Sequence, residues 1–191
     1  MLGSVLDEYG DPQEALRHLE RAKLMGSGSD VYYYIANLHY NEKRLPEALD
    51  AAKEAWKLEP DNNLVNQALY SYLLGMILFS ADRDTEAWKY MEISLTKNLE
   101  LGDRRESAST LEYMGYGYLR RGDFLNAYDT YKAAAESYRG IDEEPGCTRC
   151  KDNMAKIMDK QRNPYLYVGF ERPRGDIYRP SLFYPGATAS V

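Results

Sequence analysis

A pair of short apolar-periodic segments joined by a tight turn recurs along this chain. In its clearest copy, between Gly102 and Gly140, the segments are Ser107–Arg121 and Phe124–Tyr138, with Arg-Gly-Asp at 121–123 between them. Apolar residues at three- and four-residue steps indicate helices, and the glycine indicates a turn. The small residues are Gly115, Ala127 and Ala134, and the large ones are Leu111, Met114, Tyr118, Phe124 and Tyr131. Close-packed antiparallel helices need this mixture, because small residues let the backbones approach and large ones fill the gaps between layers.

The same small residues return at regular intervals. In the first helix of each unit they are Gly3, Ala36, Gly75 and Gly115, and in the second helix they are Ala15, Ala48, Ala87 and Ala127. Both series have steps of 33, 39 and 40 residues. A period of this length predicts a stack of helix pairs in which each unit packs on its neighbours.

Residues 29–62 match a known signature most fully, through Ala36, Ala48, Ala55 and Pro60. The pattern resembles the tetratricopeptide repeat, whose period is about 34 residues. The resemblance implies an all-α fold, a right-handed superhelix of about four helix-turn-helix repeats. In the second repeat, Ser29 or Asp30 is expected to cap the first helix.

The first repeat begins in the middle of its first helix, because Leu2, Gly3 and Leu6 occupy positions well inside the family signature. Its second helix is predicted over Pro12–Met25. Either the chain is cut from a longer protein or this first helix is short and frayed. In the third repeat, the first helix around residues 68–81 is apolar on nearly every side, which predicts burial on more than one face or a covering element.

A capping helix is predicted after the fourth repeat. After a turn at 142–146, apolar residues recur at helical steps, which indicates an amphipathic helix to about Arg162. Repeat arrays need an end cap with a polar outer face. The chain therefore divides into an array with its cap, residues 1–162, and a tail, residues 163–191.

The tail is rich in proline but carries six aromatic residues. They are Tyr165, Tyr167, Phe170, Tyr178, Phe183 and Tyr184. Disordered segments are usually poor in aromatics, so we expect the tail to dock on the array or on a partner. Its three arginines and two acidic residues give the tail a net charge of +1. The whole chain carries −6, so residues 1–163 carry −7. Tethering gives such a segment a millimolar-scale effective concentration for the array.

The resemblance also implies a binding surface. In this family, positions 2, 5, 9 and 12 of each repeat line the concave groove of the superhelix. The groove residues predicted in this way are Tyr33, Asn37, Tyr40, Tyr72, Met76, Phe79, Glu112, Tyr116 and Leu119. Aromatic residues and methionine give large, adaptable contact areas for a peptide. Only Asn37 resembles the set with which some members grip the acidic tails of heat-shock chaperones, and Tyr33 stands where a lysine is needed, so we do not expect that ligand.

Composition excludes several classes of protein. A net charge of −6 and a pI of about 5.1 argue against non-specific nucleic-acid binding. No apolar run approaches the roughly 18 residues that suggest a membrane span, and the N-terminus lacks the pattern of a secretory signal. We expect a cytoplasmic protein with no membrane insertion.

No catalytic, metal or cofactor site emerges. Cys147 and Cys150 have the spacing of half a zinc site, but His18 and His39 lie on distant repeats and zinc needs about four ligands. The helical stripe explains both cysteines as packing residues. We expect no enzyme activity, no metal and no cofactor.

The sequence predicts a non-catalytic scaffold or adaptor that binds a peptide or helix of a partner protein in its concave groove. Two alternatives stay open. One is a tetratricopeptide-type chaperone for a secreted or assembled protein, and the other is a regulatory or oligomerisation module of a larger protein. Assembly of several copies through the tail or the end repeats also stays open.

Overall fold

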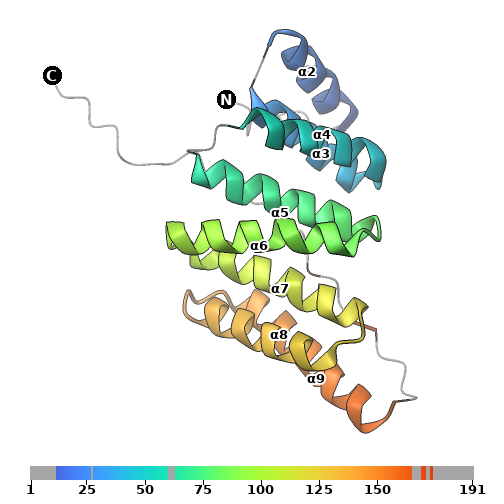
Figure 1. Cartoon of the computed structure of the whole chain (residues 1–191), viewed down its shortest axis with the longest axis vertical. Helices are drawn as coiled ribbons and strands as arrows, with labels where there is room; N and C mark the ends of the chain where they lie inside the picture. The colour runs from blue at the N-terminus through green and yellow to red at the C-terminus, as the bar shows by residue number, and fades with distance from the viewer. Residues whose placement is uncertain (1–11, 27, 60–62, 165–168, 171–172, 174–191) are drawn as a thin grey trace, which may run out of the picture.

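The structure, a computed structural model, describes residues 12–26, 28–59, 63–164, 169–170 and 173 of the 191-residue chain. In this part of the chain every regular element is an α-helix. The helices are α2 (Pro12–Leu24), α3 (Ser29–Asn41), α4 (Leu45–Leu58), α5 (Leu64–Ser80), α6 (Asp84–Leu101), α7 (Arg104–Arg120), α8 (Phe124–Arg139) and α9 (Glu144–Arg162). Figure 1 shows them stacked in chain order from α2 at one end to α9 at the other. The all-α repeat fold predicted from the sequence is confirmed.

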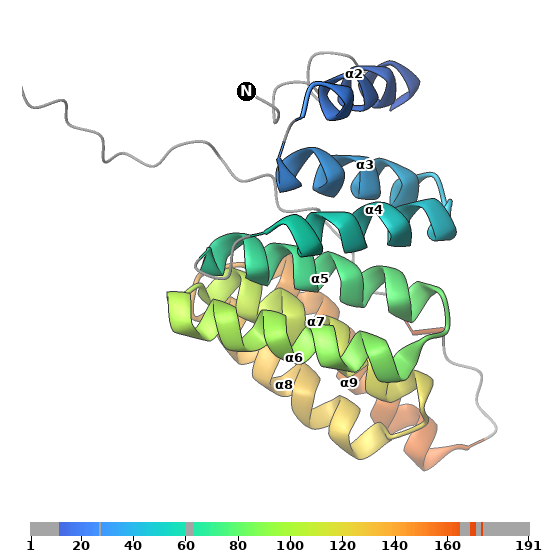
Figure 2. The same cartoon turned by 45° about the horizontal axis from the view of Figure 1, so that its top comes forward.

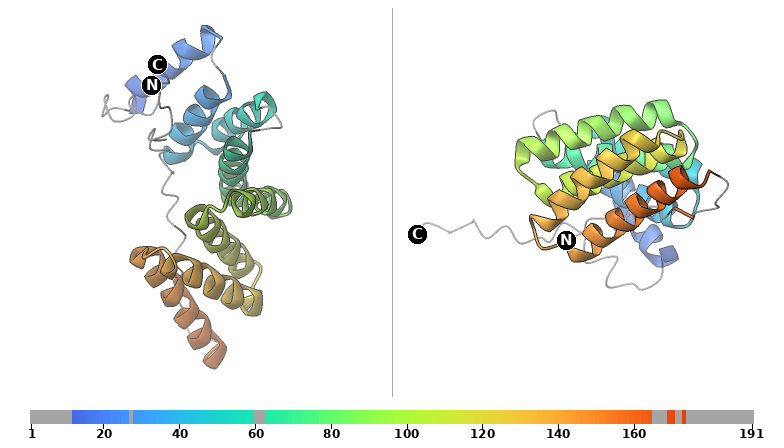
Figure 3. Two further views of the ribbon diagram at one scale, coloured as in Figure 1. Left: turned by 90° about the vertical axis from the view of Figure 1, so that its left-hand side faces the viewer. Right: turned by 90° about the horizontal axis from the view of Figure 1, so that it is seen from below.

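Consecutive helices form hairpins. The pairs α3–α4, α5–α6 and α7–α8 each pack side by side, α9 packs on α8, and every hairpin contacts the next. Seen edge-on, the stack forms an arc that opens to one side (Figure 3, left). Figure 2 shows α2 at the end of the stack, beside α3. None of the described helices is long and apolar enough to cross a membrane.

Small residues lie where the helices cross, as the repeat pattern predicts. A methyl group added at Gly75 would lie 2.8 Å from the side chain of Met91 on α6. One added at Gly115 would lie 3.1 Å from the ring of Tyr131 on α8. The close approach of the paired helices therefore depends on these glycines.

Each hairpin turn places one residue in the left-handed region, with φ values of 63° at Lys43, 58° at Asp82, 73° at Gly122 and 55° at Asp142. Aspartate tolerates this conformation better than most residues with a side chain. The turn predicted at 142–146 is shorter than expected, because α9 already begins at Glu144 and carries a proline in its first turn.

The cap predicted for α3 is wrong. Gly28 is the N-cap, and no side chain caps this helix. The two candidate caps bond to other helices instead: the hydroxyl of Ser29 donates to Glu59 at 2.6 Å, and Asp30 accepts from the hydroxyl of Tyr70 at 2.6 Å. The polar start of α3 therefore fixes it to its neighbours.

The apolar interior consists of three clusters. The largest joins α3 to α7 and includes α5, of which eleven residues are buried, so burial on several faces is confirmed. A second cluster joins α7, α8 and α9 and contains Cys147 and Cys150, which confirms both cysteines as packing residues. The third is small, and joins Ala15 and Leu19 of α2 to Val31, Ile35 and Leu38 of α3.

Candidate protein-binding face

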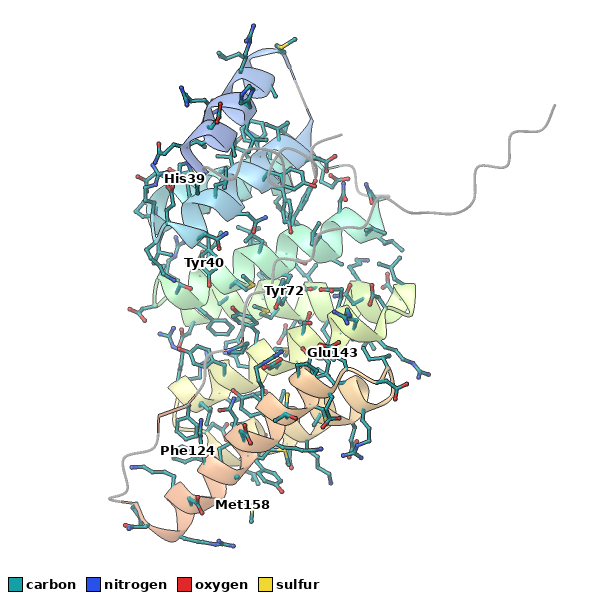
Figure 4. The ribbon with its side chains drawn as sticks, turned by 180° about the vertical axis from the view of Figure 1, so that it is seen from behind. His39, Tyr40, Tyr72, Phe124, Glu143 and Met158 are labelled. Carbon is teal, nitrogen blue, oxygen red and sulfur yellow. The ribbon has the colours of Figure 1, made fainter. Side chains whose placement is uncertain are left out.

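The residues predicted to line the groove lie on α3, α5 and α7. They are Tyr33, Asn37 and Tyr40 on α3, Tyr72, Met76 and Phe79 on α5, and Glu112, Tyr116 and Leu119 on α7. We call the side of these three helices that carries them the inner face. Figure 4 shows Tyr72 near the middle of the molecule in this view, with Tyr40 towards one edge of the stack. Tyr116 and Leu119 are half-buried, and the other seven are buried.

Aromatic rings connect α3 to α5. Tyr33 stacks on Tyr70 with 5.2 Å between ring centroids, and meets Tyr34 edge-on at 5.4 Å. Such pairs add about 0.5–1.5 kcal/mol beyond the area they bury. Burial raises the pKa of Tyr33 and of Tyr70, so both phenols stay neutral and can donate hydrogen bonds at any physiological pH.

A second aromatic pair connects α5 to α7. Tyr72 meets Tyr113 edge-on with 5.5 Å between ring centroids. Burial is the main cause that raises the pKa of Tyr72 well above its ordinary value, and nearby Tyr113, Glu106 and Glu112 raise it further. This phenol is therefore also a neutral group.

Glu112 is held in a buried ion pair. Its two carboxylate oxygens accept hydrogen bonds from Nε and Nη2 of Arg149 at 2.9 and 3.0 Å, and the hydroxyl of Tyr138 donates to it at 2.9 Å. The hydrogen bonds to Glu112 raise the pKa of Arg149, and burial raises that of Tyr138. One charged group of the predicted groove is thus neutralised by a side chain of the capping helix.

Phe79 packs between two helices. Its ring meets Trp88 of α6 edge-on at 5.8 Å, and a methyl group added at Gly117 would lie 2.6 Å from it. Beside it, Arg120 donates to the carbonyl of Phe79 and pairs with Asp82. These contacts fasten the end of α7 to the end of α5.

Asn37 lies between the aromatic pairs and the edge of the inner face. Its Nδ2 donates to the carbonyl of Tyr33 at 3.1 Å, while its Oδ1 is buried and accepts no hydrogen bond from the described residues. A buried acceptor left in this way costs about 1–3 kcal/mol. At the edge, the hydroxyls of Tyr40 and Ser80 lie 3.2 Å apart and join α3 to α5.

Glu106, in the first turn of α7, was not among the predicted site residues. Burial, and to a lesser degree Asp103, raise its pKa to about 7, and Arg105 opposes them. Its charge acts on both Tyr33 and Tyr72. No ion pair to its carboxylate is formed within the described ranges. The inner face therefore includes one half-buried acidic group that forms no ion pair with the described residues.

Sequence reasoning also missed Arg149. In the sequence it stands between Cys147 and Cys150, and no pattern there indicates that it pairs with Glu112. A signal was present in Glu112, because a single acidic residue among aromatic and apolar neighbours needs a partner. No group of three or more metal-ligating side chains occurs within the described residues. Burial raises the pKa of Cys150, so this thiol is not an activated nucleophile.

Of the tail aromatics, Phe170 is described, and the other five lie outside the described residues. The ring of Phe170 packs against the cluster of α7, α8 and α9, with 6.5 Å between its centroid and that of Phe124. Helix α9 ends at Arg162, and the division of the chain into an array and a tail stays a prediction. Docking of the tail as a whole stays a prediction.

Comparison with known proteins gives one curated relative and several structures. No family model matches the chain. The heat shock protein sti1 homolog of Schizosaccharomyces pombe is 27% identical over 133 residues, which cover 69% of this chain and 21% of that protein. The chain thus spans about a fifth of the length of this relative.

Two solved structures share the fold at lower identity. The crystal structure of BtubC from P. vanneervenii superposes with a TM-score of 0.59 at 17% identity, over 89% of this chain and 81% of that one. A crystal structure of MamA superposes with a TM-score of 0.57 at 15% identity, over 88% and 94%. At these identities the likenesses show the fold alone, a stack of α-helical hairpins, which agrees with the repeat spacing of the sequence and with the order of the helices.

Proposed function

We propose that this chain is a non-catalytic scaffold that binds a peptide segment of a partner protein on its inner face. The observation that carries the proposal is the chemistry of that face. It consists of aromatic, apolar and amide side chains, and its one predicted charge, Glu112, is already paired with Arg149. Such a surface favours ring stacking and hydrogen bonds from neutral phenols over the capture of a charged terminus.

The partner chemistry follows from the groups that remain available. Tyr116 and Leu119 on α7 are half-buried and offer apolar surface, while Glu106 offers a carboxylate that forms no ion pair with the described residues. A peptide with an aromatic residue close to a lysine or arginine fits this combination. An acidic peptide does not, because the face provides no unpaired cation at the predicted positions.

Selection of displayed random peptides on the full chain tests the proposal. We expect a consensus with an aromatic residue near a basic one, bound about tenfold more weakly by Tyr116→Ala and by Leu119→Ala. Leu125→Ala is the matched control, because Leu125 is 68% exposed and lies on α8 outside the inner face. Thermal unfolding of each variant checks that the fold is kept.

Two results would contradict the proposal. One is a consensus rich in aspartate and glutamate, and the other is equal binding of the selected peptides to all variants, including the control. Either would mean that the inner face is an interior surface of the fold and that recognition occurs elsewhere.

A further inference from the structure

The chain after α9 makes at least one contact with the array. Gly169 is exposed, whereas Phe170 packs against the cluster of α7, α8 and α9 and Pro173 is buried. The ring of Phe170 lies beside Phe124, the first residue of α8, with an angle of 33° between the rings. In Figure 4, Phe124 lies on the same edge of the stack as Tyr40. The chain has therefore returned from α9 to the edge at which the inner face ends.

From this contact we propose that the C-terminal segment, residues 163–191, lies along the inner face and acts as an internal ligand that a partner must displace. The inference rests on the proposed function, because it names the regulation of the same surface. Phe170 is the anchor of the segment at the α7–α8 edge. On this proposal the residues after Pro173 would run from α7 across α5 towards α3.

The side chains at the centre of α5 are almost completely buried. Tyr72 and Met76, at the centre of this face, are 8% and 1% exposed, and eleven residues of the helix are buried. A helix on the inner side of an open arc presents one side to the space inside the arc. Tyr72 and Met76 belong to the cluster that joins α3 to α7, so a segment docked on this side of α5 would pack against an apolar cluster.

Charge complementarity favours this segment as the occupant. Residues 1–163 carry a net charge of −7 and the remaining residues carry +1, with arginines at 172, 174 and 179. Glu106 forms no ion pair with the described residues, although Arg105 acts on it from a distance, and its charge acts on Tyr33 and Tyr72. An arginine of the segment placed between α5 and α7 would neutralise this carboxylate, as Arg149 neutralises Glu112.

The segment is long enough. After Pro173 come 18 residues, which span up to about 60 Å when extended. Neighbouring helices pack about 8–10 Å apart, so the path from α7 across α5 to α3 is about 20 Å. Because the segment is tethered, its effective concentration at the inner face is in the millimolar range, and even weak contacts keep it bound.

Hydrogen exchange on the full chain tests the proposal. In Phe170→Ala, amides of α5 between Tyr72 and Phe79 are expected to exchange about tenfold faster than in the unmodified chain, although Phe170 packs against a cluster formed by α7, α8 and α9. Leu125→Ala removes an exposed apolar side chain of the same helix as Phe124 and is expected to leave α5 unchanged. A synthetic peptide of residues 163–191 added to Phe170→Ala should restore the slower exchange.

Replacement of Arg172, Arg174 and Arg179 by glutamine supplies a second variant that leaves the aromatic anchor intact. It should also speed exchange in α5, and the effect of the arginines should fall as salt is raised. Exchange in α5 that is the same in the unmodified chain, in Phe170→Ala and in the arginine variant would overturn the proposal. Protection lost on dilution over a hundredfold range (about 1 to 100 µM) would overturn it too, because a second copy would then supply the segment.

Failure of the inference is distinguishable from failure of the proposed function. If the segment covers the inner face, selected peptides should bind Phe170→Ala about tenfold more tightly than the unmodified chain. Peptides that bind both equally, yet lose affinity on Tyr116→Ala, would refute the internal ligand and leave the scaffold function standing. Peptides whose affinity changes neither on Phe170→Ala nor on Tyr116→Ala would refute both the internal ligand and the scaffold function.

Discussion

Replacing Arg149 by methionine should destabilise the protein far more than removing an ion pair of the same geometry at the surface. Glu112 is 2% exposed and accepts two of its three hydrogen bonds from Arg149, at 2.9 and 3.0 Å. Without the guanidinium, a buried carboxylate keeps a single donor, the hydroxyl of Tyr138. Breaking a buried pair in this way costs about 3–5 kcal/mol.

Arg83 and Glu86 provide the matched control. Arg83 also donates two hydrogen bonds to its partner, both at 2.7 Å, but the two side chains are 39% and 51% exposed. Exposed pairs contribute less than about 1 kcal/mol. Arg83→Met should therefore cost less than about 1 kcal/mol, which leaves a difference of about 2–5 kcal/mol between the two variants.

Urea unfolding followed by circular dichroism at 222 nm measures the difference. The double variant Glu112→Leu with Arg149→Met separates the charge from the packing, because an apolar pair of similar volume often restores the stability of a broken ion pair. We expect it to lie within about 1 kcal/mol of the unmodified chain. A loss in Arg149→Met no larger than that in Arg83→Met would refute the reasoning, as would a double variant as unstable as the single one.

Three further predictions concern packing, pH and thiol reactivity. Gly117→Ala should lower the free energy of unfolding by about 1–3 kcal/mol, because the added methyl would lie 2.6 Å from the ring of Phe79. This overpacking outweighs the gain in helix propensity. Gly140→Ala, whose methyl makes ordinary contacts, is the control in the same urea assay. Burial raises the pKa of Glu106 from 4.5 to about 7, so the folded chain binds more protons than the unfolded chain in this window, and stability should fall as the pH rises through it. Glu106→Gln should remove that slope in urea titrations from about pH 5 to pH 8, and an unchanged slope would contradict the assignment. Cys147 and Cys150 are buried, so an aromatic disulfide reagent at about pH 8 should label neither until urea unfolds the chain, and rapid labelling in native buffer would contradict the packing.

Much of the fold was predictable because the repeat pattern in the sequence indicates both where the helices lie and which helices pack against each other. The helix predicted at Ser107 begins at Arg104, since the side chain of Asp103 caps it by accepting from the amide of Glu106. The cap of α3 was misassigned for the opposite reason, because the polar side chains at its start bond across the repeat instead of to the backbone. Local rules locate a helix, but tertiary bonds decide which polar group caps it.

The candidate site was less predictable. Repeat register singled out Tyr33 and Tyr72, each of which forms a ring pair between neighbouring helices, but it did not single out their partners Tyr70 and Tyr113. It does not give the direction of a ring, so the packing of Phe79 against Trp88 was not visible in the sequence. The pairing of Glu112 with Arg149 joins residues 37 positions apart and depends on how α9 packs, which no local pattern encodes.

The small cluster between α2 and α3 determines where this protein begins to unfold on heating. Five buried residues join these two helices, whereas the larger clusters connect several helices each. In a stack held together by neighbour contacts, the least buried junction of the described helices opens first, below the temperature at which the rest melts. Opening there would expose Val31, Ile35 and Leu38, and this apolar surface could associate with other chains. Protease nicking and aggregation on heating should therefore both start at this end of the molecule.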